Sequence, residues 1–472
     1  MFFNENFSFN VTDNSRLMIH LDCQKYLLRL STELKFVYCR LPRHSFTKYA
    51  FLMVSSLTLQ VQAQTLPEVV NRALQSYPAI QAAAAQSSSA RADIARARSA
   101  HLPQIGVAAT ASAYGSGNLP ANASRTAISP TTKLNLWSGG KIEAEVDRAK
   151  ALTQAAEFQE AGTLDDVAQL AAEAYLNWAK TSDLYSLAVH NYNAHMDTLT
   201  DIQTISQADP GRRVDYDQAL VRSENAKLAL QQRKSEFTQA IQRVQRFWPG
   251  DLSPRPFGLD AVVSDTGPLG NVPSSLAQAT AMVSGNLPAI AQAQARLQAA
   301  QASVRMAKGL QWPTVDLTVS RLPGASGRLD AVTQLQVNAP LYNGGATSAG
   351  VEAAVGQLKA AEFALEEARI LAREKSALAW QEWAAARARA GTGSQQSLVG
   401  DKLVEAYRQQ FRIAKRSLLD LLNIQADAFS YRSASQTAFH DERLARVRLL
   451  AATGELANRF ASLSGLVQAP AK

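Results

Sequence analysis

The sequence predicts a mainly α-helical fold that is interrupted by two β-hairpins and built from two similar halves. Three observations predict it. The residues that follow Leu66 recur after Leu276, so the chain carries an internal repeat. Each half contains two segments of alternating apolar and polar residues behind a proline, a pattern typical of a β-hairpin. Each hairpin precedes a long segment without proline, which predicts one long helix in each half.

The repeat divides the chain into a leader at residues 1–63, a first structural repeat at 64–262, a linker at 263–274 and a second structural repeat at 275–472. The halves are similar along their length and share one order of elements. We therefore expect both repeats to form one structural unit with internal pseudo-symmetry.

The leader contains the pattern of a secretory signal peptide at about residues 43–63. Basic residues that begin with Arg43 precede an apolar stretch, which ends at the small residue Ala63. Cleavage after Ala63 would leave Gln64 at the mature N-terminus. The segment before Arg43 is too long for the start of a signal peptide, and we interpret it as the result of a start codon assigned too far upstream.

Composition excludes several classes of function. Both cysteines, Cys23 and Cys39, lie in the leader, so the mature chain has neither disulfides nor thiol chemistry. The net charge of +8 falls to 8 − 3 = +5 without the leader, which has seven Lys/Arg and four Asp/Glu. No basic run with interleaved aromatic residues is present, so we expect no nucleic-acid partner. No segment has the roughly eighteen consecutive apolar residues of a membrane helix, so any membrane contact requires strands.

The first repeat begins with a predicted helix from Leu66 to Leu102, because this segment is rich in Ala, Gln and Arg, and Pro103 ends it. The alternating segments that follow have a side-chain period of two. We expect strands at 105–113 and 132–137 with a turn at 115–124 in the first repeat, and strands at 315–320 and 334–339 with a turn at 323–327 in the second.

Each predicted strand has one apolar and one polar face. In the first strand Ile105 and Val107 lie on one face, and Gln104 and Gly106 lie on the other. This pattern and a length of about nine to eleven residues are typical of outer-membrane barrel strands. The same pattern fits a soluble hairpin that is half buried on its own helices, and the strands alone do not decide between the two.

Long helices are predicted from Ile142 to about Gln207 and from Ala346 to about Ala414, each spanning roughly 100 Å. Small and apolar residues recur at a spacing of three or four, which favours close packing as in a coiled coil; a soluble coiled-coil rod is the alternative. The helices are expected to break at 209–211 and at 415–417. Glycine pairs are expected to form the strand-to-helix turns: Gly139, Gly140, Gly344 and Gly345.

The order of these elements resembles that of the TolC-like outer-membrane efflux and secretion proteins. The resemblance covers Leu66 to about Leu466 and includes Leu-Tyr-Asn-Gly-Gly at 341–345 and Ser-Leu-Leu-Asp-Leu-Leu-Asn-Ile-Gln at 417–425. It implies a trimer in which each chain gives four strands to one twelve-stranded outer-membrane barrel, continued by a long α-helical periplasmic tunnel. Four strands cannot close a barrel alone, and an open edge is not tolerated in lipid, which agrees with a homotrimer.

The resemblance also implies functional residues at the periplasmic tip of the helices. It places a selectivity-ring aspartate at Asp420, and three copies would concentrate negative potential at a narrow entrance. A second acidic ring of some relatives falls on Asn423, which has no charge. Contacts that close the entrance map onto Val214, Asp215, Phe411 and Arg416, with Phe411 in place of a tyrosine. From the residues alone, turn charges and helix caps are the favoured interpretation of these positions.

No catalytic, cofactor or metal site is expected. The four histidines after the leader, which include His190 and His195, show no metal-ligand spacing. The segment 138–141, Ser-Gly-Gly-Lys, lacks the upstream glycine and the following Ser or Thr of a phosphate loop.

The first functional hypothesis is a passive exit duct in the bacterial outer membrane, with its helical part in the periplasm. The resemblance implies a periplasmic adaptor (membrane fusion) protein, an inner-membrane ABC or proton-driven transporter, and outer-membrane lipid as partners. The missing cysteine at the mature N-terminus, where many efflux relatives carry a lipid, favours type I protein secretion over multidrug or metal efflux. A secreted adhesive or structural coiled coil is the second hypothesis, and an enzyme is the third and weakest.

Overall fold

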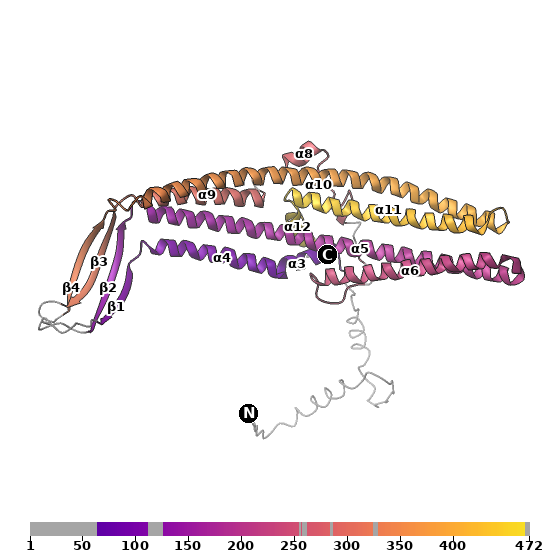
Figure 1. Cartoon of the computed structure of the whole chain (residues 1–472), viewed down its shortest axis with the longest axis horizontal. Coiled ribbons are helices and arrows are strands. Elements are labelled where there is room, and N and C mark those ends of the chain that lie inside the picture. Colours follow the sequence, from indigo (N-terminus) through magenta and orange to yellow (C-terminus); the bar gives the residue numbers. More distant parts are fainter. Residues whose placement is uncertain are drawn as a thin grey trace, which may run out of the picture. The chain divides into compact units, whose positions relative to one another are not determined.

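The computed structural model describes residues 64–111, 126–253, 256, 262–283, 287–323 and 329–467 (Figure 1). The chain divides into two compact units, Met1–Val61 and Gln62–Lys472. All described residues belong to the second unit. The predicted signal peptide, the turn at 115–124 and most of the turn at 323–327 lie outside the described residues.

The predicted order of helix, hairpin, long helix, turn and helix is confirmed in both halves. The first half contains α3 (Leu66–Ser76), α4 (Pro78–Ser99), β1 (Gln104–Ala111), β2 (Thr126–Trp137), α5 (Lys141–Ala208), the short helix η1 (Pro210–Arg212) and α6 (Arg213–Gln245). The second half contains α8 (Leu276–Ala281), α9 (Pro288–Gly309), β3 (Thr314–Pro323), β4 (Leu329–Asn338), α10 (Ala346–Arg412), α11 (Leu418–Ala452) and α12 (Leu456–Val467).

The prediction of one helix from Leu66 to Leu102 is wrong, because the segment forms two helices. Tyr77 separates them in an extended conformation, with φ −72° and ψ 130°. The ring of Pro78 disfavours helical backbone angles at the residue before it, and proline suits the first turn of the helix that follows. The second helix also ends earlier than predicted, at Ser99.

The four strands form one antiparallel sheet in the order β1-β2-β3-β4, so the pairing of β2 with β3 joins the two halves. The register aligns Leu134, Leu317 and Leu335 across three strands and therefore places their side chains on one face. The polar residues Lys133, Asp316 and Gln336 lie on the opposite face.

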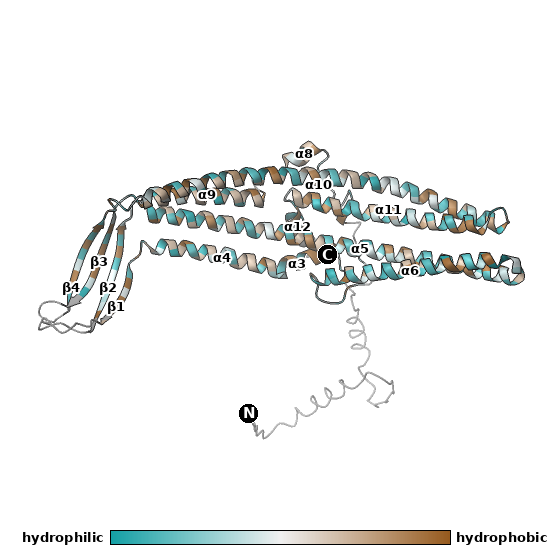
Figure 2. Ribbon diagram, viewed as in Figure 1, coloured by the Kyte–Doolittle hydropathy of each residue, from teal (hydrophilic) through white to brown (hydrophobic). Residues whose placement is uncertain are grey.

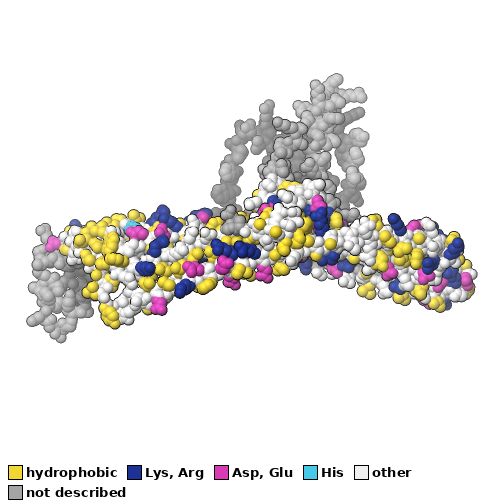
Figure 3. Space-filling model, turned by 90° about the horizontal axis from the view of Figure 1, so that it is seen from above, with side chains coloured by type: hydrophobic (Ala, Val, Ile, Leu, Met, Phe, Trp, Pro, Cys, Tyr) yellow, Lys and Arg dark blue, Asp and Glu magenta, His cyan; other side chains and the backbone are white. Residues whose placement is uncertain are grey.

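The apolar face of the sheet is exposed. Ile105, Val107 and Leu335 retain 81%, 69% and 63% of their accessible surface. Hydrophobic side chains are visible at the strand end of the molecule, on the left of Figure 3. A hairpin that packs on its own helices would bury these side chains, so the soluble-hairpin alternative does not describe this sheet.

The main helical core lies midway along the long helices, where α3, α5 and α12 pack together (Figures 1 and 2). Trp178, Tyr175 and Phe460 are fully buried there. The Tyr175 and Trp178 rings meet edge to face at 5.3 Å. These aromatic side chains are among the largest that are fully buried, in a cluster that contains residues of both halves.

Candidate functional site

The tip of the molecule is formed by the two turns that connect the long helices to α6 and α11. Both predicted helix breaks are confirmed, since α5 ends at Ala208 and α10 ends at Arg412. In the first turn the Asp209 carboxylate accepts a hydrogen bond from the Gly211 backbone at 3.0 Å. In the second turn Ala414 adopts a left-handed conformation with φ 55°, which is uncommon for a residue other than glycine.

An apolar cluster, here called the tip cluster, joins the two halves at this end. Its buried members are Leu199, Ile202, Ala219, Leu418 and Leu422, and Met196, Ile205, Tyr216 and Phe411 pack against it. The structure therefore packs Phe411 against a cluster that contains residues of both halves. Val214, which the resemblance groups with Phe411, lies outside the cluster and is 65% exposed.

The two predicted gate charges are each held within their own half. Arg212 donates from Nε to the Asp215 carboxylate at 3.0 Å. Arg416 donates from Nε to the side-chain oxygen of Gln410 at 3.0 Å and lies 4.4 Å from the centre of the Tyr407 ring. Asp215 and Arg416 are therefore engaged elsewhere and do not pair with each other in this chain.

Asp420 caps the N-terminus of α11. Its Oδ2 accepts hydrogen bonds from the Ser417 hydroxyl at 2.8 Å and the Ser417 backbone at 3.4 Å, and the Ser417 hydroxyl accepts from the Asp420 backbone. This reciprocal arrangement is a capping box. The acidic ring at Asp420 stays a prediction, because one chain does not contain the ring.

Asn423 takes part in a contact between the two halves, and its partner, Arg222, was not predicted from the sequence. Arg222 on α6 donates from Nη2 to Asn423 Oδ1 on α11 at 2.8 Å. Nearby, His195 is only 4% exposed, and burial, assisted by the charge of Arg222, lowers the pKa of its imidazole. His195 is therefore held in its neutral form at neutral pH.

The helices α5 and α11 meet along an antiparallel seam that runs from the main core to the tip cluster. Polar pairs cross this seam at successive levels: Glu173 with Arg448 at 2.9 Å, Asp183 with His440 at 2.8 Å, Lys180 with Asp441 at 2.9 Å and Thr198 with Gln425 at 3.4 Å. The residue numbers of the partners rise along α5 and fall along α11, so a single antiparallel register accounts for all four pairs.

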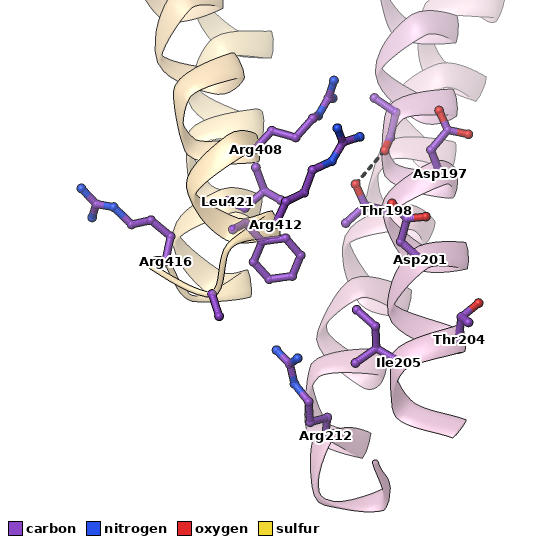
Figure 4. A pocket seen from close by; sticks show the side chains of 13 residues that line it. Asp197, Thr198, Asp201, Thr204, Ile205, Arg212, Arg408, Arg412, Arg416 and Leu421 are labelled. Atoms are coloured by element: carbon purple, nitrogen blue, oxygen red, sulfur yellow. Dashed lines mark hydrogen bonds between the residues drawn. The ribbon is translucent and has the colours of Figure 1, made fainter. Parts of the chain in front are cut away.

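A groove of about 820 Å³ lies beside this seam, between α5 and α10 (Figure 4). Arg408 and Arg412 extend from α10 toward α5, on which Asp197 and Asp201 lie, whereas Arg416 points away. The groove is lined by Ala194, Asp197, Thr198, Asp201, Thr204, Ile205, Arg212, Arg408, Phe411, Arg412, Ala414, Arg416 and Leu421. The groove could not be predicted from the sequence, because two helices from different halves form it.

The four glycines predicted as strand-to-helix turns all have positive φ: 63° at Gly139, 80° at Gly140, 67° at Gly344 and 85° at Gly345. Gly139 also has no room for a side chain, since a Cβ there would lie 2.4 Å from the Cβ of Trp312. The conformation and the close approach together explain why glycine occurs at this turn.

Two features are absent from the described part of the chain. No group of three or more His, Cys, Asp or Glu residues is arranged there to hold a metal ion. None of the helices described combines the length and the hydropathy that crossing a membrane requires.

Comparison with solved structures shows the fold. The Campylobacter jejuni CmeC outer membrane channel superposes with a TM-score of 0.72 at 15% identity, over 90% of this chain and 94% of CmeC. The outer-membrane channel OprN superposes with a TM-score of 0.71 at 20% identity, over 83% of this chain and 90% of OprN.

Comparison with characterised sequences gives relatives of similar extent. The outer membrane efflux protein BepC of Brucella suis is 25% identical over 77% of this chain and 79% of its own length. The toluene efflux pump outer membrane protein TtgC of Pseudomonas putida is 26% identical over 71% of this chain and 72% of its own. Protein CyaE of Bordetella pertussis is 29% identical over a shorter match, 36% of this chain and 37% of its own.

The profile of the family described as "Outer membrane efflux protein" matches residues 69–249 and 282–455, which together span most of the two repeats. The resemblance to TolC-like proteins is thereby confirmed. The family consists of channel proteins rather than enzymes. The chain belongs to the outer membrane efflux protein family, and it is a protein of the outer membrane whose helical part lies in the periplasm.

Proposed function

We propose that this protein is the outer-membrane duct of a tripartite export system. Three copies conduct substrate passively from an inner-membrane transporter across the periplasm and the outer membrane. The observation that carries the proposal is the exposed apolar face of the four-stranded sheet. The apolar face of such a sheet is stabilised when lipid covers it, and the opposite, polar face then borders a water-filled channel.

The edges of the sheet support a closed ring of several copies. Within the described chain, β1 and β4 each pair on one side only. Unpaired backbone groups are not tolerated in hydrocarbon, so each edge needs a partner strand. Joining β4 of one copy to β1 of the next continues the antiparallel pattern, and three copies give a barrel of twelve strands.

The helices support the same assembly. Helix α5 has 68 residues, of which 21 are buried. The equivalent helix α10 has 67 residues, of which only seven are buried. Phe363, Ile370 and Leu378 on α10 are all more than half exposed. A neighbouring copy that packs on α10 would bury this face, and the helices of three copies would enclose the tunnel.

Aromatic residues at the helical end of the strands support a membrane boundary there. Trp137 ends β2, Trp312 precedes β3, and their rings meet edge to face at 6.4 Å. Tyr342 follows β4 and is 89% exposed. Trp and Tyr concentrate at membrane–water interfaces, so we place the periplasmic surface of the membrane at this level.

We propose that Asp420 lines the entrance of the tunnel at the tip, where its capping box fixes its position. Replacing Asp420 with Asn removes the charge and keeps an oxygen for the cap. Single-channel block by a trivalent cation should weaken in Asp420→Asn, as it should in Asp420→Ala. Arg416→Ser should raise conductance if Arg416 helps to hold the entrance closed. Unchanged cation block in both Asp420 variants would count against the ring.

Two classes of exported cargo are candidates for this protein. A mature chain without cysteine favours type I secretion of a large polypeptide. The efflux in the names of BepC and TtgC, which is toluene efflux in TtgC, favours export of small toxic molecules. Both candidates need a periplasmic adaptor and an inner-membrane transporter as partners.

Deleting the gene in its host tests the proposal and separates the cargoes. Loss of a large polypeptide from the medium, with unchanged drug and metal sensitivity, supports type I secretion. Raised sensitivity to toxic small molecules with unchanged secretion supports efflux. A protein that fractionates as water-soluble and whose loss changes neither property would refute the duct and favour a structural coiled coil.

A further inference from the structure

We propose that this protein binds small organic anions in a pocket where the sheet meets the helices, here called the junction pocket. The pocket has a volume of about 520 Å³ and lies at the helical end of the strands (Figure 1). Lys141 and Arg96 supply its cationic groups, and an apolar wall lies beside them. The inference rests on the proposed channel function and deepens it, because it names one class of cargo.

The junction pocket opens on the polar face of the sheet. Its strand residues form three pairs in the register of the sheet: Gln104 with Lys133, Asn135 with Asp316, and Thr314 with Asn338. All six lie on the face opposite the exposed leucines, because side chains alternate between the two faces of a sheet. In the proposed barrel this face borders water, so a molecule that passes through the channel can reach the pocket.

The two carboxylates of the junction pocket already have partners. Asp316 is 9% exposed, accepts a hydrogen bond from Asn135 Nδ2 at 2.9 Å and lies 3.0 Å from Lys133 Nζ. Glu145 accepts hydrogen bonds from Arg148 Nε at 2.8 Å and from Arg148 Nη2 at 2.7 Å. These partners neutralise both carboxylates, so the pocket attracts a cationic ligand only weakly.

Two cations of the junction pocket keep unused donors. Lys141 forms no ion pair or side-chain hydrogen bond with the residues that the structure describes. Arg96 donates to Asp93 through Nε at 3.0 Å, and its two terminal nitrogens have no partner within the described ranges. Hydrogen bonds from Arg148 lower the pKa of Glu145, and the charges of Arg96 and Lys141 lower it further. Both cations therefore lie near the same carboxylate, on one side of the pocket.

The N-terminus of α5 favours an anion at the same place. Helix α5 begins at Lys141, and the first turn of a helix carries a partial positive charge. Ser138, which also lines the pocket, accepts a hydrogen bond from the Ile142 backbone at 3.3 Å and so fixes this turn. An anionic oxygen beside Lys141 would interact with both the ammonium group and the end of the helix.

The other wall of the junction pocket suits a hydrocarbon body. Ala97, Ala100 and Leu102 line it at the end of α4, Met306 lines it from α9, and Leu102 is 60% exposed. Sites for small molecules typically have volumes of about 300–1,000 Å³ and combine an apolar lining with a few polar groups. A small molecule with an aromatic or aliphatic body and one carboxylate or sulfonate fits both walls. The side chains of Asp and Glu have no such body, so the pocket favours a small anion over an acidic polypeptide.

Block of single-channel current in planar bilayers tests the proposal with the mature protein, residues 64–472. The probe is 2-naphthoate, added on the side of the strands, and 2-naphthamide has the same rings without the charge. Naphthoate should block the wild type, and naphthamide should block it at least about fivefold more weakly. Lys141→Gln and Arg96→Gln should each weaken the block by naphthoate about fivefold, the effect of one charge–charge contact near water. Lys141→Arg keeps the charge and should retain the block.

Lys308→Gln is the matched control. Lys308 is an exposed lysine in the last turn of α9 that does not line the junction pocket. It precedes Gly309, which packs closely on the backbone of Lys141, so both lysines begin from the same level of the molecule. Lys308→Gln should leave the block by naphthoate unchanged.

Three results would overturn the proposal. The first is a block of Lys141→Gln as strong as that of Lys308→Gln, and the second is equal block of the wild type by naphthoate and naphthamide. The third is block by polyglutamate that depends on Lys141, without any block by naphthoate, which would assign the pocket to an acidic polypeptide.

Calorimetric titration of naphthoate into the detergent-solubilised mature protein measures binding without conductance. Lys141→Gln should bind about fivefold more weakly than the wild type and Lys308→Gln do. Equal affinities in all three proteins, or no binding to the wild type, would contradict the proposal. Lys141-dependent binding by a protein that gives no conductance would support the binding site and refute the channel function.

Discussion

A lysine on the apolar face of the sheet should destabilise the protein in lipid, and a lysine on the adjacent polar face should not. Leu335 on β4 is 63% exposed and lies in a row with Leu134 and Leu317. Gln334 precedes it on the opposite face and pairs with Thr318. Leu335→Lys and Gln334→Lys therefore place the same charge at neighbouring positions of one strand, on its two sides.

The expected difference is large. A lysine on the lipid face near the middle of the membrane costs roughly 2–4 kcal/mol. Three copies in a trimer cost on the order of 6–12 kcal/mol, which is comparable to the free energy of unfolding of a whole domain, about 5–15 kcal/mol. Gln334→Lys faces water in the proposed barrel, so we expect a change within about 0.5 kcal/mol, as for other exposed positions.

Urea unfolding of each variant in phospholipid vesicles measures the difference, with the amount of trimer in isolated outer membranes as a second readout. Leu335→Lys should unfold at much lower urea concentration or fail to assemble, while Gln334→Lys should match the wild type. Equal losses in both variants, or no loss in Leu335→Lys, would refute the assignment of the apolar face to lipid.

Three further predictions concern folding and stability of the described helices and turns. Gly139→Ala should lower the free energy of unfolding by about 2–3 kcal/mol, because the backbone φ at this position is 63° and the new Cβ would meet Trp312. Thermal unfolding of the detergent-solubilised protein measures this loss, and a loss below about 0.5 kcal/mol would contradict the prediction. Ala414→Gly should raise stability by about 0.5–1 kcal/mol, since glycine adopts φ 55° without strain, and a lower thermal midpoint would argue against that reason. The fold lowers the pKa of His195, so the stability that neutral His195 contributes is present above its unfolded pKa of about 6.5 and is lost as the pH falls below that value. The urea midpoint should therefore decline less between pH 8 and pH 5 in His195→Gln than in the wild type. Identical declines in both proteins would exclude His195 as the source of the pH dependence.

Features with a local sequence signal could be predicted. The long helices follow from proline-free segments, and the strands follow from their alternation. The turns before α5 and α10 follow from the glycine pairs, because positive φ favours glycine. The break at Tyr77 also had a local signal in Pro78, but the helix propensity of the alanine-rich segment outweighed it in the prediction.

Contacts between the halves could not be predicted in the same way. Arg448 and Glu173 are 275 positions apart, and Arg222 and Asn423 are 201 apart, so neither pair leaves a pattern in the sequence. Asp215 had a partner three residues before it, Arg212, within the reach of one helical turn. Local pairing therefore competes with the contact between halves that the resemblance implied for Asp215.

Conductance of the purified mature chain, residues 64–472, in planar bilayers tests the central claim most directly, combined with a mass measurement in detergent. The account predicts a trimer that needs detergent for extraction and forms small, stable channels that polyvalent cations block. A water-soluble species that gives no conductance would contradict it and favour the coiled-coil alternative.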